Sequence, residues 1–197
     1  MNKMRVEYSS SALLRQDIPQ KVELAQWFCQ TQGWDFGIQI HNTSTERFIE
    51  KIAASGAALS FHAPVCSEYF INLAGEDRSY AWQSLAKSAE IIKKLQGSLA
   101  VFHGFLMTDR TILCFNRDRS FDECMAEAYR PELSVPGLDL CSDFFGSEEY
   151  AQRLARVQQR LHQAQQDFPE VRWCIENDYP LYGAGLLLAE HICRIDH

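Results

Sequence analysis

Short β-like runs alternate with helical stretches along this chain, and that alternation constrains the fold more than any other sequence feature. Alternating strand and helix patterns predict βαβ units, whose strands run parallel in one sheet. No internal repeat interrupts the pattern, so we expect a single domain over residues 1–197 with a long irregular insertion at about 104–146. The predicted strands are 5–8, 36–41, 57–62, 99–103 and 171–175, and the predicted helices are 20–32, 43–54, 79–95, 147–166 and 185–194.

Two parallel architectures fit this pattern, a (β/α) barrel and an open doubly wound sheet. A complete barrel needs eight strands and roughly 250 residues, whereas the chain has 197 residues. The strand count therefore favours the open sheet, but the residues at the strand ends favour the barrel. We predict an α/β fold that forms a partial TIM-type (β/α) barrel with about five parallel strands, and we keep the open doubly wound sheet as the alternative.

The composition indicates a chain that can bury a core and that has no membrane span. Hydrophobic residues make up 46% and charged residues 23%, which is typical of globular domains. No apolar run approaches the ~20 residues of a membrane helix, and no signal-peptide core follows Met1. We therefore expect a cytoplasmic protein. Seven irregularly spaced cysteines, without a Cys-x-x-Cys pair, argue against a zinc ribbon or a disulfide framework.

The charge balance opposes general affinity for nucleic acid. The net charge is −7, with 19 Lys and Arg against 26 Asp and Glu, and a negative field repels a phosphate backbone. Arg110, Arg117 and Arg119 are the one group near the strand-end residues that could grip a phosphate, and a solvated loop is the favoured interpretation.

Three predicted strands end in residues that commonly bind metals. His62 ends the third strand, His103 ends the fourth, and Glu176 follows the fifth. The carboxyl ends of parallel strands form the functional face of α/β folds, so neighbouring strands would bring these side chains together. Two imidazoles and a carboxylate form a ligand set found at catalytic zinc. A single histidine at a strand end is more often structural, but three such residues on successive strands favour a metal site.

Other polar residues are weaker candidates. His41 ends the second strand and either lines the pocket or hydrogen-bonds a loop, and the loop interpretation is favoured. Asn177 and Asp178 follow Glu176 and could orient it, as groups around a metal ligand do. His162 lies on the polar helix at 147–166, where a solvated side chain is expected, and the arginines of that helix are expected on a solvated face.

Three short motifs resemble those of the xylose-isomerase-like barrel superfamily. Residues 60–64 (Ser-Phe-His-Ala-Pro) followed by 71–74 (Ile-Asn-Leu-Ala) resemble its third-strand motif. Residues 102–104 (Phe-His-Gly) resemble the fourth-strand motif, which usually reads His-Pro-Gly, and 175–177 (Ile-Glu-Asn) resemble the fifth-strand Glu-Asn. The resemblance spans roughly residues 4–103 and 171–197, and the order of the motifs makes the set more specific than each motif alone.

The resemblance implies a metal site. In the endonuclease-IV-like branch, the residues that match His62, His103 and Glu176 bind metal. In the sugar isomerase and epimerase branch, the matching glutamate binds metal together with residues from later strands. The chain departs from the pattern at Gly104, where Pro is usual, and at Gln39, where many members have Glu. The family's sixth-strand Asp-x-x-His has no counterpart, so we expect a barrel truncated after the fifth βα unit.

These features predict a divalent-metal-dependent isomerase or epimerase that acts on a sugar or sugar phosphate. Zinc or manganese would be the cofactor, with Glu176 as the catalytic residue and a small-molecule sugar as the partner. Hydrolysis of abasic DNA, as in endonuclease IV, is the enzymatic alternative, and an inactive metal-binding remnant is the non-enzymatic one. Nucleic acid is the less favoured partner because of the charge, and self-association is expected because a partial barrel leaves open sheet edges.

Overall fold

The chain folds around one parallel five-stranded sheet. The computed structural model describes residues 4–12, 18–106, 108–114, 144 and 146–176. The strands pair in the order β1-β2-β3-β4-β5, and each is parallel to the next. Their bounds are β1 Arg5–Ser9, β2 Asp35–Ile40, β3 Ala58–His62, β4 Leu99–His103 and β5 Arg172–Glu176. Every predicted strand is therefore present, with its ends shifted by at most a residue.

Four α-helices link or flank these strands within the described residues. They are α1 Ile18–Thr31, α2 Glu46–Ala53, α3 Ser79–Lys94 and α6 Glu148–Asp167, and a 3-10 turn, η1, covers Ser10–Ala12. Ser147 caps α6 because its side-chain oxygen accepts a hydrogen bond from the backbone N–H of Tyr150. None of the described helices is long and apolar enough to span a membrane. The predicted helix at 185–194 lies outside the described residues.

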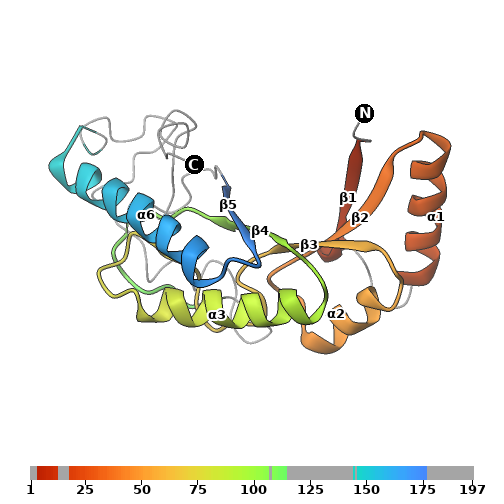
Figure 1. Cartoon of the computed structure of the whole chain (residues 1–197), viewed down its shortest axis with the longest axis horizontal. Helices are drawn as coiled ribbons and strands as arrows, with labels where there is room; N and C mark the ends of the chain where they lie inside the picture. The colour runs from red at the N-terminus through yellow and green to blue at the C-terminus, as the bar shows by residue number, and fades with distance from the viewer. Residues whose placement is uncertain (1–3, 13–17, 107, 115–143, 145, 177–197) are drawn as a thin grey trace.

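The strand order decides how the layers are arranged. Consecutive parallel strands joined by right-handed crossovers place every helix on the same side of the sheet. Figure 1 shows the four helices along the outer side of a curved sheet, from α1 at one end to α6 at the other. The order does not reverse, as it would in a doubly wound sheet. The α/β prediction is confirmed, and the sheet is open rather than closed into a barrel, with β1 and β5 as its edges in the described part of the chain.

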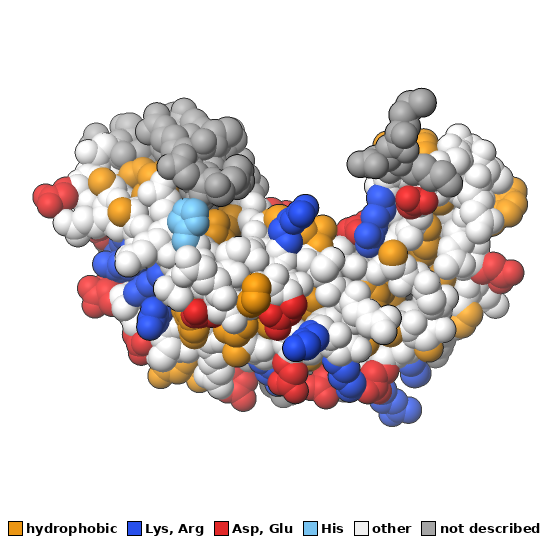
Figure 2. Space-filling model, in the orientation of Figure 1, with side chains coloured by type: hydrophobic (Ala, Val, Ile, Leu, Met, Phe, Trp, Pro, Cys, Tyr) orange, Lys and Arg blue, Asp and Glu red, His pale blue; other side chains and the backbone are white. Residues whose placement is uncertain are grey.

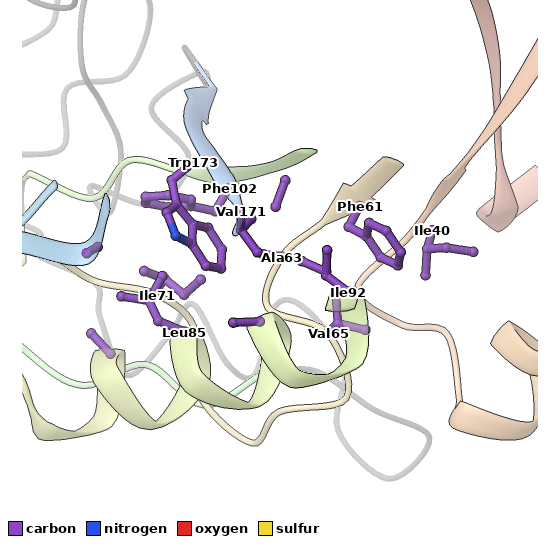
Figure 3. Packing of buried hydrophobic residues seen from close by; sticks show 14 of the residues in the cluster. Ile40, Phe61, Ala63, Val65, Ile71, Leu85, Ile92, Phe102, Val171 and Trp173 are labelled. Atoms are coloured by element: carbon purple, nitrogen blue, oxygen red, sulfur yellow. The ribbon is translucent and has the colours of Figure 1, made fainter. Parts of the chain in front are cut away.

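The two faces of the sheet differ in chemistry because side chains alternate along each strand. The outer face is apolar and packs against the helices, and Figure 3 shows Phe61, Phe102 and Trp173 among residues of this core. The concave inner face carries polar residues at the alternate positions, among them Glu7, Gln39 and Ser60. In Figure 2 the molecular surface is hollowed between the α1 end and the α6 end.

The apolar residues of α1 do not pack as the sequence suggests. Val22, Leu24, Trp27 and Phe28 are apolar positions of this helix, but Leu24, Trp27 and Phe28 are 64%, 60% and 50% exposed. The buried face consists of Ile18, Val22 and Cys29. Positions 24, 27 and 28 point away from the sheet, because β1 is the edge strand and no described element lies beyond it.

The arginines of α6 correct a second expectation, because they do not lie on a solvated face. Arg153 is 5% exposed and donates to the carbonyl oxygen of Leu106 at 2.9 Å. Arg156 donates to the carbonyl of Ala74, and Arg160 donates to the carbonyls of Leu73, Gly75 and Glu76. Arg156 and Arg160, which the sequence assigned to solvent, thus hold the loop that follows β3, whose carbonyl oxygens are not used by a strand or helix, and Arg153 holds the segment that follows β4. His162, by contrast, is exposed as expected.

Most of the predicted insertion at 104–146 lies outside the described residues, but its first part runs beside the loop after β3. The backbone N–H of Phe70 donates to the carbonyl of Ile112, and that of Cys114 donates to the carbonyl of Glu68. Buried Asn72 joins the same two segments, because its Nδ2 donates to the carbonyls of Thr108 and Arg110. The Asn-Leu-Ala motif therefore has a structural role in this chain.

Candidate metal centre

His62 is the last residue of β3 and points to the concave face. Its neighbour Phe61 is fully buried in the core on the opposite face, so strand alternation directs His62 inward. The residue is 7% exposed. The chain then turns away from the sheet through a cis Ala63–Pro64 peptide.

His103 ends β4, the strand next to β3. Phe102 lies in the outer core, so His103 also faces inward, where it is partly buried. The ring centroids of His62 and His103 are 4.6 Å apart. The two imidazoles therefore sit side by side at the carboxyl edge of the sheet.

Glu176 is the last residue of β5 and pairs in register with His103. Its Oε2 atom lies 3.0 Å from Nε2 of His62 and 3.9 Å from Nδ1 of His103. The Glu176 side chain is 45% exposed, so the carboxylate is open to solvent on one side and contacts the histidines on the other. The structure thus brings together the three residues that the sequence predicted to meet.

The geometry of this cluster fits a divalent metal ion. One ligand atom from each residue lies within 4.8 Å of the others. Nitrogen and oxygen ligands lie about 2.1 Å from a tetrahedral zinc ion, and therefore about 3.4 Å from one another. The separations of the Glu176 carboxylate oxygen from His62 and His103, 3.0 and 3.9 Å, bracket that spacing. His62, His103 and Glu176 could therefore hold a metal through two imidazoles and a carboxylate, and a fourth position would stay open to water or substrate.

His41 lies beside the cluster and also bonds its own loop. Its Nδ1 atom is 2.8 Å from the Thr43 hydroxyl, and its ring centroid is 5.5 Å from that of His62. Burial, followed by the imidazoles of His62 and His103, lowers the pKa of His41, and the Glu176 carboxylate partly opposes them. A neutral His41 at neutral pH adds no positive charge next to a cation. The hydrogen bond to Thr43 agrees with the loop interpretation.

Asn177 and Asp178, predicted to orient Glu176, lie outside the described residues, as do Arg117 and Arg119. Arg110 is exposed, in the segment that follows β4. Arg5 is a described cation close in sequence to the polar residues of the inner face. Its Nη2 forms an ion pair of 2.8 Å with Glu7.

Sequence reasoning missed one acidic residue of the concave face, Glu7 on β1. Its Oε2 accepts a hydrogen bond of 2.5 Å from the Ser60 hydroxyl on β3. The signal was present, because a charged residue alternates with Val6 and Tyr8 in a predicted strand and so belongs to the polar face. No ligand-type motif marked it, since its partner lies 53 positions away.

Comparisons with known proteins add little. No protein-family model matches the chain, and no curated protein matches it. One similar solved structure is that of the TTHB071 protein from Thermus thermophilus, described as soaked with ZnCl2. The identity is 16% and the TM-score 0.37, over 90% of this chain and 57% of that one, so this chain spans little more than half of the other protein's length. A likeness this weak carries no argument, and membership of the xylose-isomerase-like superfamily stays a prediction.

Proposed function

We propose that this chain is a divalent-metal-dependent protein of the xylose-isomerase-like type, which isomerises or epimerises a sugar or sugar phosphate. The observation that carries the proposal is the convergence of His62, His103 and Glu176 at the carboxyl edge of three neighbouring parallel strands. That edge is where α/β folds place their active sites.

The residues of the cluster have distinct parts in this proposal. His62 is nearly buried and held next to Glu176, so it would provide a fixed ligand. Glu176 is both a ligand and the most exposed of the three, so its carboxylate can also accept a proton from a bound hydroxyl or carbon acid. A bound zinc or manganese ion would polarise the substrate's carbonyl or hydroxyl oxygen.

The surroundings of the cluster favour a small polar substrate over a nucleic acid. A pocket on the concave face is lined by Glu176 and by the polar side chains of Glu7, Gln39 and Ser60. A sugar needs a compact pocket with a few polar groups. A DNA backbone needs several unpaired cations, and Arg5 on this face already pairs with Glu7.

Hydrolysis at abasic DNA is the second candidate, and one observation favours it. Both histidines lie with the glutamate in one cluster, as the resemblance to the endonuclease-IV-like branch implies. In the sugar enzymes the glutamate acts with residues from later strands instead.

The test compares both activities in one preparation. Zinc- or manganese-loaded protein is incubated with ketoses and sugar phosphates, and isomerisation is followed by NMR. Binding and cleavage of an abasic-site duplex are measured at low and moderate salt. Isomerisation that is lost in Glu176→Gln and His62→Ala but kept in His162→Ala supports the proposal. Salt-sensitive duplex cleavage with the same dependence would replace it with the second candidate. Bound metal without either activity would indicate an inactive remnant.

A further inference from the structure

A pocket of about 340 Å³ lies on the concave face of the sheet, and all five strands contribute to it. Its position follows from strand register, because its residues precede the metal-cluster residues by two positions. Ser60 precedes His62, Val101 precedes His103, and Cys174 precedes Glu176. The complete lining is Glu7, Gln39, Ser60, Phe61, Leu99, Val101, Cys174 and Glu176. The pocket therefore lies one layer of side chains below the metal cluster, and Glu176 belongs to both.

One side of the pocket is a polar cluster from the first three strands. The Ser60 hydroxyl, in a residue only 3% exposed, donates to Glu7 at 2.5 Å. Gln39 pairs in register with Ser60, and its side-chain amide makes no hydrogen bond within the described part of the chain. Glu7 is also paired with Arg5 at 2.8 Å, and the guanidinium lies over Gly37, where a side-chain carbon would come within 2.8 Å of it.

The other side of the pocket is less polar. Leu99 and Val101 of β4 provide aliphatic surface between the polar cluster and β5. Glu176 is at the carboxyl end of β5 and carries the exposed carboxylate described above. A molecule in this pocket would therefore meet hydrogen-bonding groups at both ends and carbon surface between them.

These positions have a different role in a closed barrel. There the inward side chains are branched aliphatic residues that fill a dry interior. Here the inward-facing positions hold the carboxylate of Glu7, the amide of Gln39 and the hydroxyl of Ser60. Polar groups in a concave site need hydrogen-bond partners from the chain, from water or from a ligand. The polar layer is thus suited to binding and is poorly suited to packing.

We infer that Glu7, Gln39 and Ser60 form a binding subsite for a neutral molecule rich in hydroxyl groups. The Glu7 carboxylate accepts hydrogen bonds from hydroxyls, and the Gln39 amide can both donate and accept. A phosphate group is disfavoured there, because Glu7 repels it and the Arg5 charge is already compensated. The inference rests on the proposed function only in placing the other end of the ligand beside the metal cluster, and it narrows the substrate class to unphosphorylated sugars or polyols.

The experiment is calorimetric titration of the full chain, with and without zinc. The probes are pentoses, hexoses and their sugar alcohols, each paired with its phosphate where one exists. We expect at least one neutral probe to bind more tightly than its phosphate. Gln39→Met, which keeps side-chain length and removes the amide, should weaken that binding about tenfold. Gln83→Met, an exposed glutamine on α3, is the matched control and should leave it unchanged.

A second variant tests whether Glu7 disfavours a phosphate. Its readout is a change of ligand preference, which a general loss of folding would not produce. Glu7→Gln releases Arg5, so the preference for the neutral probe over its phosphate should shrink or reverse. Tighter binding of the phosphates by the unmodified protein overturns the inference. So does an unchanged affinity in Gln39→Met, or the absence of binding by every neutral probe. Metal titration of the same samples separates the two proposals: zinc binding without polyol binding removes the subsite alone, and polyol binding without zinc binding removes the proposed metal chemistry alone.

Discussion

The Nε2 atom of His62 lies 3.0 Å from Oε2 of Glu176, although the two residues are 114 positions apart in the chain. The sheet makes this contact, because β3, β4 and β5 are consecutive neighbours and both residues end their strands. The same arrangement brings His103 between them, and three residues from three βα units form one cluster.

Replacing His103 by Ala should remove most bound metal. Two ligands from the chain remain, and the loss should exceed the ~10–100-fold drop in affinity that follows removal of a group that merely supports a ligand. Zinc affinity is measured by competition with a chelating dye, and metal content after dialysis gives the stoichiometry. His162→Ala, on the exposed side of α6, is the control. Equal zinc affinity in His103→Ala and the unmodified protein would rule out this site.

Replacing Arg160 by Ala should destabilise the fold by about 2 kcal/mol, because charged donors to carbonyl oxygens contribute more than neutral ones. The guanidinium donates to the carbonyls of Leu73, Gly75 and Glu76. The stability of Arg160→Lys should lie between that of the unmodified protein and that of Arg160→Ala, since an ammonium group cannot reproduce the forked geometry of the guanidinium. Urea unfolding measures the change, with exposed Gln159→Ala as the control. Equal midpoints for Arg160→Ala and Gln159→Ala would show that the loop contacts contribute nothing.

Replacing Gly97 by Ala should cost about 1–3 kcal/mol through overpacking. A side-chain carbon at this position would lie 2.3 Å from Cε2 of Phe61. Gly56→Ala provides the contrast, because that site has open space but a φ of +72°, and its cost of about 1–2 kcal/mol is conformational. Phe61→Leu should relieve the Gly97 variant and leave the Gly56 variant unrelieved. Thermal unfolding of the single and double variants measures these effects. If Phe61→Leu changed the stability of the Gly97 and Gly56 variants equally, overpacking against Phe61 would not be the cause of the Gly97 effect.

The contact between Trp82 and Asp167 should make part of the stability sensitive to acid. The Trp82 indole N–H donates to Asp167 at 2.8 Å, and this bond, with a second from Gln163, lowers the pKa of Asp167. A carboxyl whose folded-state pKa is lowered stabilises the fold above its ordinary pKa, and that contribution is lost as the pH falls through the lowered value. The difference in Tm between the unmodified protein and Asp167→Ala should therefore be present at neutral pH and vanish in acid. A Tm difference that stays constant down to the acid limit would exclude this linkage.

The exposed apolar residues of α1 should drive self-association. Leu24, Trp27 and Phe28 occupy one helical face and are at least half exposed, and contiguous apolar surface of this kind promotes association with a second copy. Trp27→Lys should reduce binding of an apolar dye and lower the mass measured by light scattering. Gln30→Lys adds the same charge to an exposed position of the same helix and should not. A monomer that binds no dye before any substitution would contradict this expectation.

What could be predicted from the sequence was local in origin. Strand and helix bounds follow from hydrophobic periodicity, and the positions of His62 and His103 follow from those bounds alone. The hydrogen bonds of Arg156 and Arg160 to the loop after β3 could not be predicted, because the accepting carbonyl groups lie more than eighty positions away. The exposure of Trp27 could not be predicted either, since spacing identifies an apolar face but does not say where the sheet ends. At the end of α3, Gln96 takes the left-handed conformation, with a φ of 57°, and Gly97 is needed for its small size.

The strand order has a consequence for how the chain acquires its structure. Each strand pairs with the strand that precedes it in sequence, so the sheet can grow one unit at a time from the N-terminal end as the chain leaves the ribosome. Contacts between nearby units close short loops and form early. Arg156 and Arg160 of α6, in contrast, join positions 82 to 87 residues apart. Their hydrogen bonds to the loop after β3 can form only once α6 has been synthesised, so these bonds form late in folding.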